Sequence, residues 1–564
     1  MNKKMIWIIL SLGLAVHFGI TGQTVTIQPG TTYQVHEGFG TSLCWFGNVI
    51  GGFPDTAKND IADLLFDQEY GIGINVVRYN IGGGDNPSHD HMRAGAELEG
   101  FQPSQGNWDW NADTTQRWML QAAKNRVPAG DFVAEAFSNS PPYWMTNSNC
   151  SAGASGGADN LNTSYLNTFA DYLTEVVRHF RDYWGINFKT LEPMNEPGGG
   201  WTVNGGQEGC HMNSSIQNNL IKAVYSSLTS KGLSNVIISA PDGMNVSNTI
   251  SHYNGYDSTT RSYVGQINTH GYAGSASECS SLRNTAQNAG KELWQSECDS
   301  GGARGDVWGE YTFNPDDIIP ALTLSEQIYF YLKELRPKSW VFWQAVENWP
   351  NMIDENRNWG LMLANLESSG RNGVAYQEYR TTKKYYAFGQ YSKFIRPGFQ
   401  QIGIDNSQAV AFINWDTGQV VIVHTNHNSG SSSVTYNLSQ FNTVGSSVEV
   451  YRTSASQNLA RLADINVSNK QFSTSLPGYS VTTFLVSTPD SSATPTPPPV
   501  MAGDVNDDGM VTIVDALMTA QCYVGLITCP SAAASDVNCS GSTDIVDALM
   551  IAQYYVGLIS SLGC

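Results

Sequence analysis

The sequence is poor in basic residues and contains few charged residues of any kind. Lys and Arg number 30 against 50 Asp and Glu, the formal net charge is −20, and charged residues make up 14% of the chain. Binding to nucleic acid or to an anionic membrane requires concentrated Lys and Arg, because phosphates must be neutralised. The composition therefore disfavours both partners, and we predict that the protein binds no nucleic acid.

Long apolar runs are also scarce. One run, from Met5 to Ile20, follows Lys3 and Lys4 and precedes small residues. This order is typical of a signal peptide, which we predict over residues 1–22, and the run is short for a membrane-spanning helix. No later stretch is apolar enough to cross a bilayer. We therefore predict a secreted, extracellular protein that has no membrane span after signal cleavage.

The nine cysteines include no CxxC pair and no Cys/His cluster with the sequence spacing of a zinc site. In an exported protein they permit disulfides without fixing their connectivity. Five cysteines precede a stretch rich in Ser, Thr and Pro at 488–500, and four follow it. The odd first group leaves at least one thiol free unless a bridge crosses that stretch.

The 488–500 stretch is predicted to be a linker between a large part of the chain and a small one. From 38 to 389, short β-rich runs alternate with amphipathic stretches such as 165–183 and 214–231. This alternation predicts the α/β class and, at this length, a (β/α)8 TIM barrel. From 390 to 487 the pattern is strand-like, and we expect it to pair with 24–37 in a side β-sandwich.

The small part, residues 501–564, contains a duplicated acidic loop. The copies begin at Asp504 and Asp536, and both have oxygen-bearing side chains at positions 1, 3, 5, 9 and 12 with Gly at position 6. Calcium requires six to eight oxygen ligands on a sharply turning loop, which predicts two Ca²⁺ ions here. The predicted ligand positions are Asp504, Asn506, Asp508, Met510, Thr512, Asp515, Asp536, Asn538, Ser540, Ser542, Asp544 and Asp547.

The duplicated loop and the helix predicted after it resemble a type I dockerin, a small α-helical module that binds a cohesin on a scaffold or cell surface. The resemblance implies a cohesin partner and a cellulosome-like location. Ile513-Val514 and Ile545-Val546 stand where many dockerins carry Ser or Thr, so the cohesin class stays open. Calcium-dependent self-association or surface attachment is the alternative. From residue 503 on there are seven Asp and no Lys, Arg or Glu, which predicts folding only with calcium.

Two glutamates close strand-like runs in the large part. Glu196 ends FKTLEPMNEP and Glu297 ends ELWQSE. Cleavage of a glycosidic bond requires a carboxylic acid that protonates the leaving oxygen and a carboxylate that faces the anomeric carbon. Either glutamate alone is a weak signal, because most glutamates are surface or salt-bridged acids. The ends of other β-rich runs, where a barrel presents its active site, add Arg78, His270, Tyr272 and Trp343.

From residue 24 to residue 486 the chain resembles glycoside hydrolase family 30 of clan A, through GFGTSLCWF, RYNIGGG, FSNSPPYWM, EPMNEP, INTHGY, LWQSE and FWQA. Within the family, SNSPPYWM and GWTVNGGQEGCH are similar to endo-β-1,6-galactanases. The resemblance implies a retaining enzyme that needs no cofactor for catalysis, with Glu196 as acid/base and Glu297 as nucleophile. The two carboxyl groups are then expected about 5–5.5 Å apart.

The resemblance also implies roles in substrate binding. Asn195 would bind the sugar 2-hydroxyl, and Trp343 would form the floor of the subsite that binds the glycon. Tyr272 would donate a hydrogen bond to Glu297, and Arg78 would lie near Glu297. A further group is predicted to bind sugar, with packing an equally good interpretation for each member: Trp45, Asn139, Trp144, Trp201, Glu208 and His270.

The expected activity is endo-hydrolysis of β-1,6-linked galactan, such as the side chains of arabinogalactan. Other family 30 activities, on glucuronoxylan or β-1,6-glucan, are the alternatives. A glucuronate-binding pocket requires a basic cluster, and none is evident in the sequence, which favours a neutral sugar. A non-catalytic glycan-binding surface protein is disfavoured, because such a protein has no need of a carboxylate pair.

Overall fold

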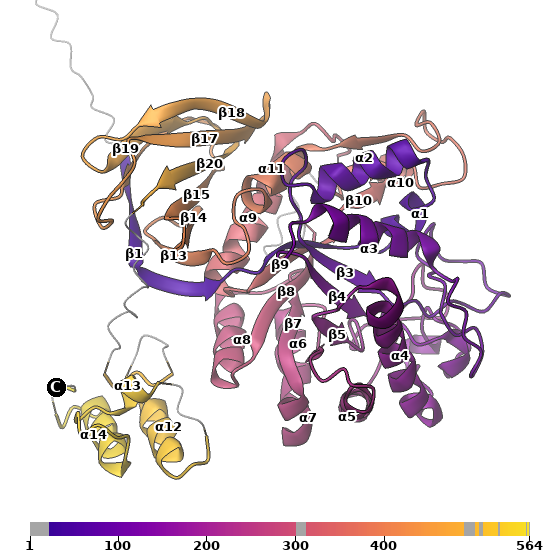
Figure 1. Ribbon diagram of the computed structural model, residues 1–564, viewed down its shortest axis with the longest axis horizontal. Coiled ribbons are helices and arrows are strands. Elements are labelled where there is room, and N and C mark those ends of the chain that lie inside the picture. Colours follow the sequence, from indigo (N-terminus) through magenta and orange to yellow (C-terminus); the bar gives the residue numbers. More distant parts are fainter. Residues whose placement is uncertain are drawn as a thin grey trace, which may run out of the picture.

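The computed structural model describes residues 22–299, 312–489, 502–506, 511–527, 531–559 and 561–562. Residues 1–21 of the predicted signal peptide and 490–500 of the predicted linker lie outside these ranges. The large part of the chain forms a barrel surrounded by helices and flanked by a sheet, and the small part forms a helical module (Figure 1).

Eight parallel strands close the barrel in sequence order, and β9 returns to pair with β2, where Phe39 lies opposite Trp340. The strands are short, apolar and buried on both faces, as expected for a parallel barrel. Their bounds are β2 (Gly38–Ser42), β3 (Val76–Asn80), β4 (Val133–Phe137), β5 (Thr190–Glu192), β6 (Ile237–Ser239), β7 (Val264–His270), β8 (Glu292–Cys298) and β9 (Ser339–Gln344).

Helices cover the outside of the barrel, and two of them match the amphipathic stretches predicted at 165–183 and 214–231. The side chain of Asn213 caps α5, and Gly185 in the left-handed conformation ends α4. The helices are α1 (Phe46–Ile50), α2 (Asp55–Phe66), α3 (Thr114–Arg126), α4 (Leu166–Trp184), α5 (Ser214–Ser230), α6 (Val246–Asn254), α7 (Ser258–Tyr263), α8 (Ala276–Asn288), α9 (Ile318–Glu334), α10 (Trp349–Asp354) and α11 (Lys383–Ser392). A small sheet comprises β10 (Val346–Asn348), β11 (Met362–Ala364) and β12 (Tyr379–Thr381).

The flanking sheet joins the two ends of the large part, as predicted. Strand β1 pairs antiparallel with β13 and parallel with β16. One face of β14 and β15 packs on the barrel core, and the other face belongs to a separate core inside the folded sheet. The strands are β1 (Gln23–Val35), β13 (Gln400–Ile404), β14 (Ala409–Asn414), β15 (Gln419–Asn426), β16 (Ser432–Asn437), β17 (Ser447–Ser454), β18 (Gln457–Asn466), β19 (Gln471–Leu476) and β20 (Ser480–Ser487).

The C-terminal module consists of α12 (Ile513–Tyr523), α13 (Ala532–Ser535) and α14 (Ile545–Tyr555). The first turns of α12 and α14 have equivalent capping boxes, made by Thr512 with Asp515 and by Asp544 with Asp547. The duplication in the sequence is therefore a duplication of structure. Its apolar core is small, which is typical of a module that needs a metal or disulfides.

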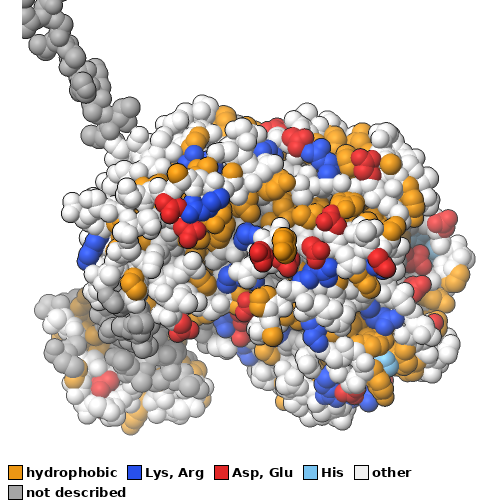
Figure 2. Space-filling view, turned by 45° about the horizontal axis from the view of Figure 1, so that its top comes forward, with side chains coloured by type: hydrophobic (Ala, Val, Ile, Leu, Met, Phe, Trp, Pro, Cys, Tyr) orange, Lys and Arg blue, Asp and Glu red, His pale blue; other side chains and the backbone are white. Residues whose placement is uncertain are grey.

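The surface carries charges of both signs. Figure 2 shows acidic and basic side chains side by side on one face, with hydrophobic side chains between them. Within the described ranges, no helix combines the length and apolarity needed to cross a bilayer.

Candidate active site

Glu196 and Glu297 lie together at the carboxyl ends of the barrel strands. Glu297 is on β8, and Glu196 follows β5. One carboxylate oxygen of each, together with a ring nitrogen of His270, lies within 4.8 Å of the others. Glu196 is 8% exposed and Glu297 is 4% exposed. Two glutamates separated by 101 positions thus converge in a nearly buried site.

The backbone of Glu196 is held in an uncommon conformation. Its φ is 45°, in the left-handed region, where a non-glycine residue costs on the order of 1–3 kcal/mol. Its N–H donates to the carbonyl oxygen of Asp242 at 3.0 Å, and its own carbonyl accepts from Trp201 Nε1 at 3.1 Å. These contacts fix the turn that directs the Glu196 side chain toward Glu297.

Arg78 binds four carboxylates inside the barrel. Its guanidinium donates to Glu135 at 2.9 Å, Glu192 at 3.1 Å, Asp242 at 2.8 Å and Glu297 at 3.0 Å. Burial opposes the charge of Arg78, but these carboxylates raise its pKa well above the ordinary value. Arg78 therefore stays cationic, and it holds one oxygen of Glu297 in place.

His270 lies between the two glutamates of the site. Its Nδ1 is 2.9 Å from Glu196 Oε1 and 3.4 Å from Glu297 Oε1, and its Nε2 is 2.9 Å from Asp242. Burial lowers the pKa of His270, but Asp242 and Glu297 outweigh it and raise that pKa well above its usual value. A protonated imidazole here offsets the repulsion between the paired carboxylates.

Burial raises the pKa of Glu297 to about 7, and His270 and Arg78 oppose that rise. The hydroxyl of Tyr272 also donates to Glu297 Oε1 at 3.0 Å, which favours the ionised form. Glu297 is thus a carboxylate with three fixed donors around it, a suitable arrangement for a nucleophile with a defined orientation.

Several residues of the predicted sugar-binding set have buried polar atoms that lack a partner among the described residues. Asn195 Oδ1, Asn139 Oδ1 and Trp45 Nε1 are buried without a hydrogen-bond partner among the described residues. Trp45 packs edge-on against Trp343, with 5.1 Å between ring centroids. Buried polar groups are usually paired, so these unpaired groups, with Asn195 directly before Glu196, are candidates for hydrogen bonds to ligand hydroxyls.

The surroundings of Glu208 favour the packing interpretation of this residue. It is fully buried, and it accepts from Asn80 Nδ2 at 2.9 Å and from the N–H of Gly83 at 3.0 Å. Burial raises the pKa of Glu208 to about 8. Its carboxyl group ties the loop after β5 to the end of β3, so Glu208 holds these two segments together.

Two predicted tryptophans lie farther from the carboxylates. Trp144 donates from Nε1 to the carbonyl of Gln102 and packs against Tyr165. Trp201 contacts the carbonyl of Glu196 and no carboxylate oxygen. Packing explains both residues as well as sugar binding does.

Three buried acids of the site were missed in the sequence: Glu135, Glu192 and Asp242. All three are fully buried and bind Arg78. Their signal was present, because Glu135 interrupts the apolar run DFVAEAF and Glu192 interrupts FKTLEP. An acid inside a buried strand must be paired with a cation or hydrogen-bond donors.

The calcium loops of the C-terminal module are described in part. Asp508 and Met510 lie outside the described residues. Asp515 and Asp547 are fully buried, and each accepts from backbone N–H groups of its own loop. Asp536 accepts from the N–H groups of Ser540 and Gly541, at 3.0 and 2.9 Å. Since the segment has no Lys or Arg, buried carboxylates here fit a bound cation.

An exposed apolar surface accompanies these loops. It consists of equivalent residues from both copies, with equal exposure: Ile513 and Ile545 are each 51% exposed, and Leu517 and Leu549 are each 57% exposed. An apolar surface of this kind on a small module is typical of a protein-binding site.

Comparison with known proteins agrees with this geometry. Residues 22–354 match the family described as O-Glycosyl hydrolase family 30. The chain belongs to glycoside hydrolase family 30. It is a glycoside hydrolase, and enzymes of this family need no cofactor. Residues 502–555 match the dockerin type I domain, which generally binds calcium and implies a cohesin partner and an extracellular, cellulosome-type location.

Two characterised relatives are similar to this family 30 chain. An endo-β-1,6-galactanase of Hypocrea rufa is 30% identical to this chain, and the match covers 85% of this chain and 97% of the galactanase. An exo-β-1,6-galactobiohydrolase of Bifidobacterium longum is 24% identical, over 77% of this chain but 36% of its own. Among solved structures, the catalytic domain of a family 30 xylanase C from Talaromyces cellulolyticus shares the fold, with a TM-score of 0.62 and 19% identity over 83% of this chain and 100% of that one.

Proposed function

We propose that the enzyme is a secreted endo-hydrolase of β-1,6-linked galactan, such as the side chains of arabinogalactan. The observation that carries the proposal is the convergence of Glu196 and Glu297 within 4.8 Å, in a family 30 barrel. The choice of galactan is supported by the similarity to an endo-β-1,6-galactanase over 85% of the chain.

In the proposed reaction the glycosidic bond is cleaved with retention. Glu196 protonates the leaving oxygen while the carboxylate of Glu297 attacks the anomeric carbon, which gives a covalent glycosyl ester. Water then attacks the same carbon, Glu196 takes its proton, and the ester bond to Glu297 breaks. The short separation of the two carboxyl groups suits this double displacement, because an inverting enzyme needs room for a water molecule between them.

The neighbouring residues support the charges that this reaction requires. Arg78 and Tyr272 orient Glu297 and favour its ionised form. Nδ1 of His270 contacts both glutamates. Its N–H can therefore stabilise the negative charge on whichever glutamate is ionised at each step. We assign binding of the sugar 2-hydroxyl to Asn195, and binding of the glycon to Trp45, Asn139 and Trp343.

The second candidate is another family 30 activity, on glucuronoxylan or β-1,6-glucan. Arg93 is the observation in its favour, because its guanidinium lies 3.7 Å from the centre of the Trp45 ring and offers a cation near the proposed subsite. The same guanidinium donates to Gln207, and a single arginine is a weaker signal than a basic cluster.

Reducing-end assays on de-arabinosylated arabinogalactan, glucuronoxylan and β-1,6-glucan test the specificity. We expect activity on the galactan alone, with oligosaccharides of several lengths as early products of endo cleavage. Inactivity on galactan with turnover of either other glycan would refute the galactan assignment. Release of a single short product from the start would replace the endo assignment with an exo one.

We propose further that the C-terminal module binds two Ca²⁺ ions and then docks on a cohesin through its apolar surface. The equal exposure of Ile513 and Ile545 supports two equivalent docking surfaces. The full-length protein, mixed with a panel of cohesins, is expected to form a complex in calcium and none in chelator. Self-association without any cohesin would favour the alternative of calcium-dependent attachment between copies.

A further inference from the structure

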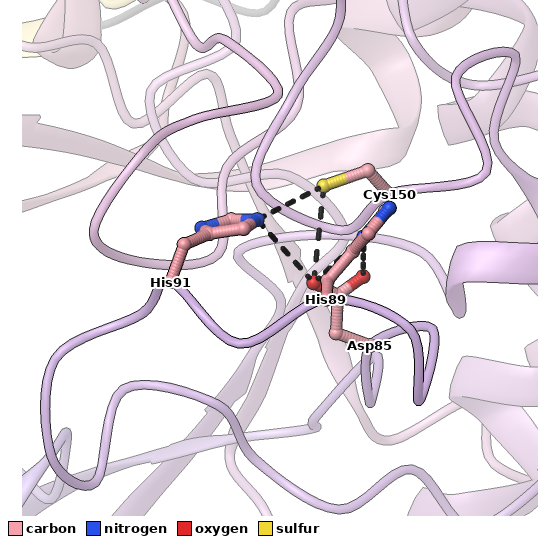
Figure 3. A group of neighbouring side chains, drawn as sticks. All are labelled: Asp85, His89, His91 and Cys150. Carbon is pink, nitrogen blue, oxygen red and sulfur yellow. Dashed lines mark hydrogen bonds and ion pairs between the residues drawn. The ribbon is translucent and has the colours of Figure 1, made fainter.

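A second cluster of metal-binding side chains lies among the loops that follow β3 and β4. Asp85, His89, His91 and Cys150 each direct one donor atom to a common point, and these atoms all lie within 4.8 Å of one another (Figure 3). The cluster shares no residue with the proposed catalytic site, and the hydrolysis mechanism makes no use of it.

Four of the six separations between the donor atoms lie at or slightly above those of a tetrahedral zinc site. Cys150 Sγ is 3.8 Å from both Asp85 Oδ2 and His91 Nε2, and Asp85 Oδ2 is 3.3 Å from His89 Nδ1 and 3.9 Å from His91 Nε2. With Zn–N near 2.05 Å and Zn–S near 2.3 Å, a tetrahedron places its donor atoms roughly 3.3–3.6 Å apart. Asp85 Oδ2 and His91 Nε2, at 3.9 Å, are too far apart for a direct hydrogen bond, and the two 3.8 Å contacts of Cys150 Sγ are weak ones.

The surrounding hydrogen bonds turn the metal-binding atoms of His91 and Asp85 toward the cluster, as is usual for metal ligands. His91 Nδ1 is 2.8 Å from the carbonyl oxygen of Gly205, which fixes the proton on Nδ1 and leaves the lone pair of Nε2 facing the cluster. Asp85 Oδ1 accepts from the backbone N–H groups of Ser151 and Asn86, at 3.0 and 2.8 Å, so Oδ2 is left to face the other ligands.

The sulfur is prepared in a similar way. The N–H of Ala152 donates to Cys150 Sγ at 3.4 Å, which helps to fix the position of the sulfur. Cys150 is fully buried, and the structure records it as a free cysteine. Asp85 is also buried, whereas His89 and His91 have side chains that are 30% and 24% exposed, which gives an ion a route of entry.

We propose that Asp85, His89, His91 and Cys150 bind one Zn²⁺ ion in a closed, four-coordinate structural site. Four protein ligands leave no open position, so the ion holds structure and does not activate water. The sequence could not show this site through a spacing motif, because Cys150 is 59 residues from His91 and the fold brings the two together.

The ion would clamp two loops at the mouth of the barrel, and a hydrogen bond from one ligand would hold a third loop. Asp85, His89 and His91 follow β3, Cys150 follows β4, and the loop after β5 supplies the carbonyl of Gly205. The first loop continues to Arg93, whose N–H donates to the carbonyl of Gly206. The second loop reaches Trp201 through the N–H of Ala154, at 3.2 Å from the Trp201 carbonyl. Trp201 in turn contacts the backbone of Glu196. Zinc would thus stabilise the frame around the catalytic turn.

Metal analysis of the full-length protein tests the proposal. The protein is loaded with zinc, passed through a desalting column and analysed by inductively coupled plasma mass spectrometry. We expect about one zinc per chain, and at least a tenfold loss in Cys150→Ser and in His91→Gln, because a closed site loses most of its affinity with one ligand. His211→Gln and Cys279→Ser, a histidine and a cysteine outside the cluster, are the controls and should keep the zinc.

Cobalt gives an independent measurement. Co²⁺ in place of zinc should show a thiolate-to-cobalt charge-transfer band and the intense visible bands of tetrahedral coordination, and Cys150→Ser should remove the former. His89→Gln changes the most exposed of the four ligands, so it is the variant least expected to disturb folding. Circular dichroism checks that each variant is folded. Absence of zinc from the folded wild-type protein, or equal zinc in all three cluster variants and the controls, would overturn the proposal.

Discussion

The barrel mouth and the C-terminal module both bury carboxylates, but they neutralise them differently. At the barrel mouth, Arg78 contacts four carboxylates and His270 contacts three. In the module, Asp515 and Asp547 are equally buried, yet the segment from residue 503 has no Lys, Arg or Glu. The chain supplies the cations in one region, and we propose that bound calcium supplies them in the other.

This difference has a consequence for stability and function. A carboxylate balanced by the chain itself can be tuned in pKa and kept for chemistry, independent of any ion in solution. A carboxylate balanced by a metal makes folding itself depend on the metal concentration. We therefore expect removal of calcium to abolish docking but not catalysis. Mutation of the cationic side chains in the barrel should impair catalysis but not docking.

The largest expected effect is on catalysis. Glu297→Gln removes the proposed nucleophile and should lower kcat on galactan by about 10⁴-fold or more, since no other carboxylate can form the glycosyl ester. Reducing-end release measures it. Glu292→Gln, on the same strand but at the opposite end of the barrel, is the matched control and should retain activity. Equal turnover by Glu297→Gln and the wild-type protein would remove the catalytic assignment.

Calcium removal should separate the two regions completely. With a chelator in excess, residues from 502 on are expected to unfold, because the carboxylates repel one another and the apolar core is small. Limited proteolysis followed by mass spectrometry should then cut within this segment and leave the barrel intact. Galactan hydrolysis should be unchanged when zinc is added back without calcium, which keeps the proposed site of Asp85, His89, His91 and Cys150 filled. Protease resistance of the module in chelator would contradict its dependence on calcium.

The converse experiment targets the internal cation. Arg78→Met leaves buried carboxylates without their partner, and removal of one partner of a buried ion pair costs about 3–5 kcal/mol. Chemical denaturation monitored by tryptophan fluorescence should show this loss in the barrel transition, with no rescue by calcium. Arg461→Met, at an exposed ion pair on the flanking sheet, is the control and should change stability little. Equal stability of the Arg78→Met and Arg461→Met variants would show that Arg78 is not what neutralises the buried carboxylates of the barrel.

A smaller effect is expected from Tyr272→Phe. The hydroxyl of Tyr272 donates to Glu297, so its loss should raise the pKa of Glu297 further above its ordinary 4.5, from about 7 in the wild-type protein. The acid limb of the kcat/KM profile should move to higher pH, because the nucleophile must be ionised. An acid limb that does not move would show that Tyr272 leaves the charge of Glu297 unaffected.

The raised pKa of Glu297 also makes the stability of the folded protein depend on pH. Between pH 4.5 and about 7 the folded state holds a proton that the unfolded chain has released, so the contribution of Glu297 to stability falls as the pH rises through this window. His270 has a raised pKa as well, and its contribution is complete below about 6.5 and is lost as the pH rises through the folded value.

Much of the fold could be predicted because its signals are local. The alternation of apolar β-runs with amphipathic stretches predicted the barrel, and α4 and α5 lie within one residue of the expected ranges. The repeated loop spacing predicted the module for the same reason. The pairing of β1 with both β13 and β16 was expected only in outline, since register depends on side chains far apart in sequence.

The site could be predicted less completely. Glu196 closely follows β5 and Glu297 lies near the end of β8, and the sequence marks both at the ends of strand-like runs. Glu208 has no such mark, and only its burial and its hydrogen bonds reveal its contacts between loops. The partners of Arg78 come from separate strands and loops, and the residues around Cys150 come from one loop that lies far from it in the sequence. No spacing rule connects such residues, because the fold alone brings them together.

The stereochemistry of cleavage tests the central claim most directly. Proton NMR of galactan hydrolysis, recorded before the product anomers equilibrate, reports which anomer forms first. A carboxyl pair as close as Glu196 and Glu297 predicts the β-anomer, through a covalent intermediate on Glu297. First appearance of the α-anomer would mean inversion, and it would contradict the roles assigned to both glutamates.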